Sequence, residues 1–147
     1  MNSLERVAAA IAFQPTDRVP VIAQVFGHAA ALADVPLDDY VQNLRGFRET
    51  ASRCGAQVVY LTRPHLPAIE NLEPVFKWRL NVPSYNEALR RFARESGDLL
   101  VDVQAEFATR DVFADECHLT PQGLCAMAEF VCQELQRHSD RLHFAAP

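Results

Sequence analysis

Apolar side chains recur at helical spacing in four segments of the chain, and this pattern predicts amphipathic helices. The predicted helices span residues 2–14, 37–54, 84–96 and 120–135. Gly55 and Gly97 stand where the second and third helices need a left-handed residue to end them. Thr120 followed by Pro121 is typical of a helix start. Cap residues therefore support the boundaries that the periodicity indicates.

Two of these helices carry further signals. Ser84 and Glu87 have the spacing of a capping box, which predicts that the third helix begins there. The last helix should direct one apolar stripe toward the core. That stripe consists of Leu124, Met127, Ala128, Val131 and Leu135. Cys125 and Cys132 lie seven residues apart on the same helix, and we expect both to be small buried side chains.

Three short apolar runs, rich in β-branched residues, predict buried strands. They are residues 19–26, 56–62 and 99–103. Because strands and helices alternate, we expect adjacent parallel strands with helical crossovers. The predicted fold is a single α/β domain over residues 1–147, with three αβα layers around a short parallel sheet whose carboxyl edge holds any site. Residues 63–83 contain four prolines and no clear period, which predicts a long irregular connection.

Composition and charge exclude several classes of function. The net charge is −5, and the 14 basic residues are scattered among 19 acidic ones, which disfavours nucleic-acid binding. No run of apolar residues is long enough for a membrane span, and the N-terminus lacks a signal-peptide pattern, so we expect a cytoplasmic protein without membrane contact. The 4 cysteines form no CxxC pair and are expected to be reduced thiols. Neither a metal site nor a cofactor is indicated.

Asp115 and His118 carry the clearest candidate chemistry. They stand three residues apart in "DVFADECHLTPQG", immediately before the last predicted helix. A carboxylate that holds one ring nitrogen of a histidine makes the other nitrogen an effective general base near neutral pH. A solvated loop pair is the plainer interpretation of the same spacing. The choice between a loop pair and an acid–base pair therefore depends on the rest of the sequence.

The chain from about Tyr40 to Leu135 resembles the SGNH, or GDSL-type, hydrolases. The resemblance runs through "YVQNLRGFRETASRCGAQVVYLT", and its most specific segments are "YNEALRRFARESGDLLVDV" and "DVFADECHLTPQGLCAMAEFV". That family consists of esterases and lipases on a flavodoxin-like three-layer α/β fold. The resemblance implies that Asp115 and His118 occupy the acid and base positions. It also implies a small acyl ester or acetylated carbohydrate as ligand, with no cofactor.

Two parts of the family pattern are absent. The family places its nucleophile serine in a Gly-Asp-Ser turn after the first strand, and no serine here has that sequence or position. The serines are Ser3, Ser52, Ser84, Ser96 and Ser139. A second family turn, Gly-x-Asn-Asp, should lie near "VFGHAAALA", where Gly27 and His28 are oxyanion-turn candidates but Ala29 and Ala30 replace the Asn and Asp. Alanine cannot donate the side-chain hydrogen bond that such a site uses.

Residues 3–40 have a different likeness. They resemble the opening of the uroporphyrinogen decarboxylase family, which includes corrinoid-linked methyltransferases on a TIM barrel. A barrel needs more than two hundred residues, roughly, and the later substrate-binding and zinc-binding segments of that family have no counterpart here. We interpret the chain as a join near residues 27–40, with SGNH-like sequence from residue 40 onward. A barrel fragment is the competing architecture.

Three function hypotheses follow from these resemblances. The first is an active esterase or deacetylase with an unrecognised nucleophile, and the second is a hydrolase-like scaffold with impaired catalysis that binds a ligand or partner. The third is a decarboxylase-related or methyltransferase-related protein. The retained pair favours the first two, and the missing serine favours the second. A short sheet leaves an unpaired edge, so we also expect a homo-oligomer.

Other reactive residues have plainer explanations. Cys117 adjoins His118, but neighbouring side chains rarely point at one another, which disfavours it as a nucleophile. A zinc site is also disfavoured, because its candidate ligands lack paired spacing. These candidates are Cys117, His118, Asp115 and the distant His65. Trp78 is expected to pack rather than to line an acyl pocket, and His28 to be an ordinary loop histidine.

Overall fold

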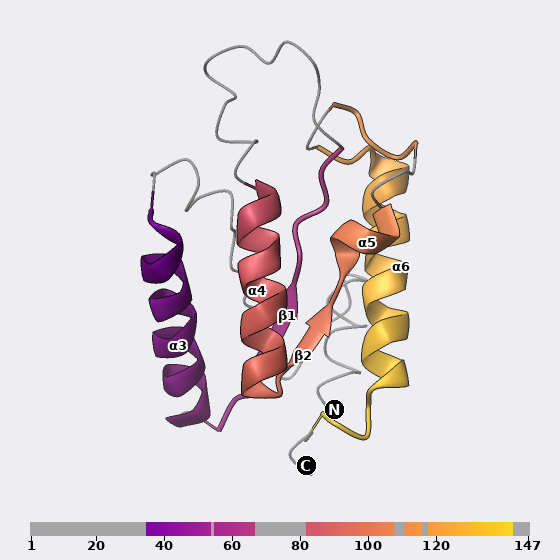
Figure 1. The fold of residues 1–147 in the computed structure, drawn as a ribbon. Coiled ribbons are helices and arrows are strands. Elements are labelled where there is room, and N and C mark those ends of the chain that lie inside the picture. The colour runs from indigo at the N-terminus through magenta and orange to yellow at the C-terminus, as the bar shows by residue number, and fades with distance from the viewer. Residues whose placement is uncertain (1–34, 54, 67–81, 108–110, 116–117, 143–147) are drawn as a thin grey trace.

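The structure is a computed structural model that describes residues 35–53, 55–66, 82–107, 111–115 and 118–142. In these ranges the elements are α3 (Leu37–Arg53), β1 (Val59–Leu61), α4 (Val82–Ser96), β2 (Leu99–Val101), α5 (Val103–Phe107) and α6 (Pro121–Arg137) (Figure 1). None of the helices within them is long and apolar enough to cross a membrane. The predicted first helix and the predicted strand over residues 19–26 lie outside the described residues.

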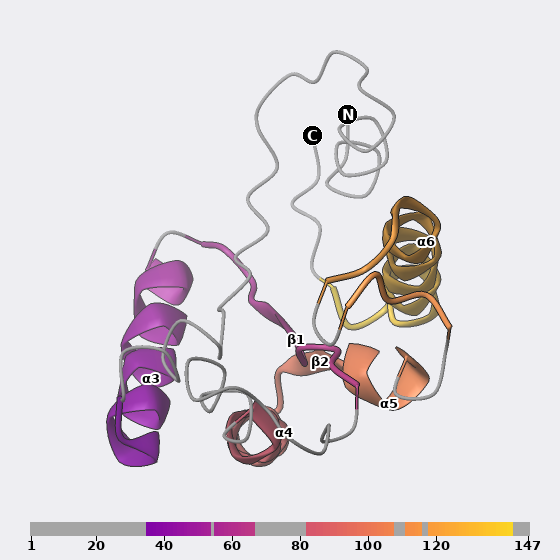
Figure 2. The ribbon, with the colours of Figure 1, turned by 90° about the horizontal axis from the view of Figure 1, so that it is seen from above.

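The two described strands are parallel, as the sequence predicts. Val59 pairs with Leu99 and Leu61 with Val101. Figure 2 shows α3 and α4 on one side of the strands and α6 on the other. The described residues therefore form three layers, αβα, which confirms the predicted fold class.

Alternating side chains of the strands fill a core on each face of the sheet. On one face Tyr60 packs edge-to-face on Phe92 of α4, within a cluster that includes Tyr40 and Leu44 of α3. On the other face Val101 and Phe107 pack against α6, where Phe107 meets Phe130 edge-to-face at 6.0 Å. This alternation is what a strand covered on both faces requires.

The predicted glycine caps are correct. Gly55 and Gly97 have φ angles of +66° and +72°, so both adopt the left-handed conformation directly after α3 and α4. The amides of Gly55 and Ala56 donate to the carbonyl groups of Ser52 and Ala51, which satisfies the end of α3.

Helix α4 begins two residues before the predicted capping box. Val82 is the first helical residue, Pro83 lies in the first turn, and Ser84 is already inside the helix. Glu87 lies within 3.6 Å of Arg90 and 3.7 Å of Arg94 instead of closing a capping box. The earlier start is explained by the burial of Val82, which lies one helical turn before the buried Asn86 and extends the buried face of the helix.

Strand β2 is shorter than predicted, ending at Val101 rather than at residue 103. Asp102 caps the short helix α5, since its Oδ1 accepts a hydrogen bond from the amide of Ala105 at 3.2 Å. Val103 and Phe107 then lie one helical turn apart, and both are buried. A run of apolar residues alone could not show this change of conformation at Asp102.

Helix α6 confirms part of the predicted stripe, since Met127 and Val131 pack against the core and Ala128 and Leu135 are half-buried, but its buried face is rotated away from Leu124. Its Ala126, Met127, Phe130 and Val131 pack against the sheet, whereas Leu124 is 52% exposed. Cys125 is exposed and Cys132 is half-buried, so the prediction that both are buried is wrong. The contact of Gly123 with residues 112 and 119 fixes the rotation of the helix and carries Leu124 and Cys125 outward.

Side chains at the carboxyl ends of the two strands are joined through Asp102. Its carboxylate accepts two hydrogen bonds from Arg90, at 2.8 and 2.9 Å, and one from Thr62, at 2.8 Å. Burial alone would raise the pKa of Asp102, but the hydrogen bonds from Arg90 and Thr62 outweigh burial and hold the pKa below its ordinary value. The carboxylate therefore links the end of β1, the end of β2 and α4.

We expect Asp102→Ala to lower the free energy of unfolding by about 2 kcal/mol, because it removes a charged acceptor and leaves the half-buried Arg90 with only the exposed carboxylate of Glu87. Urea denaturation followed by circular dichroism would measure the loss. Asp98→Ala, which removes the partner of the exposed Arg48 at the other end of β2, should cost clearly less. Equal losses would contradict the special role of Asp102.

Candidate active site

The start of α6 holds the segment that carries Asp115 and His118. Thr120 caps the helix, with its Oγ1 accepting from the amide of Gly123 at 3.0 Å, as predicted. The amide and hydroxyl of Thr120 both donate to the carbonyl group of Val112, at 2.8 and 3.1 Å. Phe113 and Leu119 form an antiparallel bridge. Residues 112 and 120 are thereby tied together, and the described residues between them, 113–115 and 118–119, form a loop.

Asp115 and His118 are in direct contact within this loop. The Nδ1 of His118 lies 2.7 Å from Oδ2 of Asp115, and the backbone amide of His118 donates to Oδ1 at 2.8 Å. A carboxylate can only accept, so this contact places the imidazole hydrogen on Nδ1 and makes Nε2 the basic nitrogen. The geometry is that of a base and the carboxylate that orients it.

The pair is open to solvent. The side chain of His118 is 72% exposed and that of Asp115 is 44% exposed. In high dielectric, such a pair gains modest electrostatic energy. Its main physical effect is therefore to fix the tautomer and orientation of an imidazole that a molecule from solution can reach.

Gly123 is the tightest point between α6 and the loop. A Cβ at this position would lie 2.3 Å from the carbonyl oxygen of Val112 and 3.2 Å from the Cβ of Leu119. Only glycine lets the first turn of α6 approach the two residues that anchor the loop. The "HLTPQG" sequence thus supplies both the histidine and the close packing that positions it.

The described serines do not lie where a nucleophile for His118 is needed. Ser52 and Ser96 lie at the ends of α3 and α4, and Ser139 follows α6, all at the amino edge of the sheet, whereas the loop lies at the carboxyl edge (Figure 1). Ser96 also donates to Asp98 at 2.7 Å. Ser84 is in the first turn of α4, on the opposite face of the sheet from α6.

Several sequence candidates lie outside the described residues. They are Gly27, His28, Ala29, Ala30, Ser3, Cys117 and Trp78. Within the ranges that are described, no group of three or more His, Cys, Asp or Glu side chains could hold a metal ion.

The segment after β1 is a part of the carboxyl edge that sequence reasoning missed. The side-chain amide of Asn86 bonds both backbone groups of Arg63, at 2.9 Å each, and that of Gln104 bonds both backbone groups of His65, at 2.7 and 3.1 Å. Side chains of α4 and α5 thus hold the segment that follows β1. The sequence did offer a signal for this edge, because the polar residues Thr62 and Asp102 directly follow the two buried strands.

His65 lies in this held segment and is half-buried. Burial lowers its pKa, although the carbonyl group of Arg63 and the side chain of Gln104 act in the opposite direction. The imidazole is therefore held in its neutral form to a lower pH than an exposed histidine would be.

The chain is similar in fold to a solved structure. That structure is of a protein from Desulfitobacterium hafniense DCB-2 assigned to the lipolytic G-D-S-L family, and it matches with a TM-score of 0.58 at 15% sequence identity. The match covers 92% of this chain and 76% of that chain. No protein-family model and no curated protein matches the sequence. At this identity the likeness shows a common α/β fold, while the resemblances over residues 40–135 and over residues 3–40 stay predictions.

We expect Gly123→Ala to destabilise the protein by roughly 1–3 kcal/mol and to displace the Asp115–His118 loop, because the new methyl group overlaps the carbonyl oxygen of Val112. Gly46→Ala is the matched control, since its Cβ would meet nothing within 4 Å in the middle of α3. It should stabilise by about 0.5–1 kcal/mol. Thermal unfolding and amide NMR shifts around His118 would separate the two effects; unchanged shifts in Gly123→Ala would refute the packing argument.

The lowered pKa of His65 predicts a pH dependence of stability. The folded protein binds this proton less readily than the unfolded chain, so the stabilisation is complete above the unfolded value of about 6.5 and is lost as the pH falls toward the folded value. His65→Gln should flatten the decline in unfolding free energy between about pH 7 and pH 5. Denaturation curves at several pH values would measure this, and parallel declines in both proteins would contradict it.

Proposed function

We propose that the protein is a GDSL-type hydrolase-like scaffold that keeps the acid–base pair, has lost the serine nucleophile, and binds a small acyl ester or acetylated carbohydrate without appreciable serine-esterase turnover. The observation that carries this proposal is the 2.7 Å contact between His118 and Asp115 on a GDSL-like fold. A homo-oligomer is part of the proposal, because the sheet is short.

The pair supports a hydrolase ancestry through its geometry. Asp115 uses one carboxylate oxygen for the ring of His118 and the other for the backbone amide of the same residue. A loop pair that met by chance would need neither the double contact nor the Thr120 and Gly123 packing beneath it. Together these contacts hold the imidazole in one orientation at the carboxyl edge, where parallel α/β sheets carry their sites.

The absence of turnover follows from the missing nucleophile. In a triad that works as a unit, removing the serine costs about a million-fold in rate, and the remainder comes from the oxyanion hole and binding. Ala29 stands where the resemblance calls for an oxyanion donor, so that contribution is also reduced. An exposed imidazole alone can only assist water or transfer an acyl group slowly.

An active esterase is the competing function, and it would need a nucleophile in a part of the chain that is not described. The serine that the sequence offers there is Ser3, and the thiols are Cys54 and Cys117. A decarboxylase-related function rests on residues 3–40 alone and gains no support from the GDSL-like fold.

Hydrolysis of p-nitrophenyl acetate by the purified full-length protein tests the proposal. We expect a weak background that His118→Ala lowers by roughly tenfold or less, because general-base assistance without a nucleophile contributes little. His138→Ala is the matched control, since His138 lies at the far end of α6 beside Glu134. It should leave the background unchanged.

Labelling with a fluorophosphonate, followed by mass spectrometry, provides the decisive comparison. No serine should be labelled in stoichiometric amount. Saturable esterase activity that His118→Ala abolishes, together with one fully labelled serine, would replace the scaffold proposal with an active enzyme.

A further inference from the structure

The two faces of the described sheet differ in how completely they are covered. On the face of α3 and α4, Val58 and Tyr60 are buried, and seven residues of α4 are buried with them. On the face of α6, Val59 and Leu61 of β1 are only half-buried. Helix α6 itself buries a single residue, Gly123. The apolar core on the α6 face is therefore incomplete.

The incomplete part of this core lies over β1 rather than over β2. Val101 of β2 belongs to the same apolar cluster as Val59 and Leu61, yet it is fully buried. Figures 1 and 2 show the reason, because α6 lies on the β2 side of the strand pair. The α6-side surface thus consists of half-buried apolar side chains from β1 and α6. They are Val59, Leu61, Met127, Phe130 and Val131.

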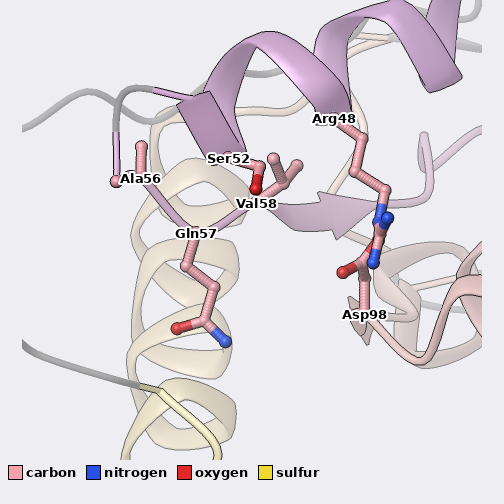
Figure 3. Close-up of a pocket in the computed structure, with 7 residues that line it drawn as sticks. Arg48, Ser52, Ala56, Gln57, Val58 and Asp98 are labelled. Carbon is pink, nitrogen blue, oxygen red and sulfur yellow. The ribbon is translucent and has the colours of Figure 1, made fainter.

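The amino end of this surface is closed by the chain that follows α6. Figure 3 shows that Val58 points toward α3, whereas Gln57 points the opposite way. The side-chain amide of Gln57 donates to the carbonyl group of Arg141 at 2.8 Å. Val59 and Leu61 point in the same direction as Gln57, because side chains alternate along a strand. The contact with Arg141 covers the position before β1 and leaves these two residues to another segment.

The order of the elements along the chain indicates which segment reaches the α6-side surface. The sequence predicts a strand over residues 19–26, before α3, and a helix over residues 2–14, before that strand. Helix α4 connects β1 to β2, and α3 lies on the same face as α4 (Figure 2). Crossovers between parallel strands are right-handed in nearly all proteins. A strand joined to β1 through α3 therefore belongs on the edge of β1 that faces away from β2.

The short connection between the predicted helix and the predicted strand limits where the helix can lie. Only residues 15–18 separate the two. Four extended residues span about 13 Å, which is enough to pass between layers packed roughly 10 Å apart. On one face this position is taken by α3, whose Tyr40 and Leu44 pack in the cluster of Tyr60. The α6 face is the one on which β1 is still partly exposed.

The apolar side of the predicted helix suits an apolar surface. Four residues at helical spacing form that side, and they are Leu4, Val7, Ala8 and Ile11. Arg6 and Ala9 lie on the opposite side. In proteins most of the stability of such a helix comes from packing its apolar side against other elements. Contact with Val59 and Leu61 would remove apolar surface of both partners from water.

We propose that residues 2–14 form a helix that docks on the α6-side surface and runs antiparallel to the strand over residues 19–26. The occupant is this segment of the same chain, and it completes the second core. The inference concerns the fold, so it does not depend on the proposed function. A second copy of the chain is the alternative occupant that the experiment must exclude.

Methyl NMR spectra of the full-length protein test this proposal directly. We expect nuclear Overhauser contacts from Val7 or Ile11 to the methyl groups of Val59 or Leu61. A sample mixed from isotope-labelled and unlabelled chains should show no such contact between different copies. Contacts that cross between copies would overturn the proposal, as would contacts with Leu44 on the other face or the absence of any contact.

Two neighbouring substitutions give a matched comparison. Ala8→Asp places a charge on the apolar side of the predicted helix, and Ala9→Asp makes the same change on the opposite side. We expect Ala8→Asp to shift the methyl resonances of Leu61 and to speed amide hydrogen exchange at Val131 by roughly tenfold or more, because docking is lost. Ala9→Asp should change neither.

Val7→Ala, a milder change on the apolar side, should also shift the resonances of Leu61, and it gives the same comparison if Ala8→Asp prevents folding. Equal effects of Ala8→Asp and Ala9→Asp would show that the apolar side does not dock. Unchanged resonances of Leu61 in both Ala8→Asp and Val7→Ala would also overturn the proposal.

Discussion

At the end of β2 the carboxylate of Asp102 receives hydrogen bonds from Arg90, Thr62 and the amide of Ala105. These contacts fix where both strands end, how α4 lies against them and where α5 begins. The backbone amide of Gln104 donates to the hydroxyl group of Thr62, and the side chain of Gln104 accepts from the backbone amide of His65. Gln104 thereby extends the same network to the segment that contains His65. The carboxyl edge is therefore organised by side chains, because only three residue pairs of backbone ladder join the two described strands.

The position of the Asp115–His118 loop follows from this arrangement through packing. Asp102 caps α5, whose Phe107 is fully buried and meets Phe130 of α6. The rotation of α6 then brings Gly123 against Val112, and Thr120 ties the loop to the helix. The imidazole of His118 is oriented by a chain of contacts that begins in the core, although the pair itself is exposed to solvent. An imidazole in this state is open to a molecule from solution.

Much of this organisation was predictable from the sequence, and the exceptions have physical causes. Glycines 55 and 97, the Thr120 cap and the parallel pairing were predictable because each depends on local backbone chemistry or on a simple period. The contact of Asp115 with His118 was predictable from spacing. The face of α6 was predictable only in part: Met127 and Val131 pack against the core as the period indicates, but Leu124 and Phe130 are both strongly apolar, and the close fit of Gly123 against Val112 turns Phe130 rather than Leu124 inward. The end of β2 at Val101 was missed because the partners of Asp102 come from residues 12 and 40 positions away.

We propose that Asp115 orients His118 and that no serine or cysteine serves it as a nucleophile. A high-resolution crystal structure of the full chain tests this proposal most directly, through the distance from Nε2 of His118 to the nearest serine hydroxyl or cysteine thiol. The account predicts that neither group comes within about 3.2 Å, the reach of a hydrogen bond to a general base. A hydroxyl of Ser3 or the thiol of Cys117 at about that distance, with Asp115 still holding Nδ1, would contradict the account and restore a complete triad.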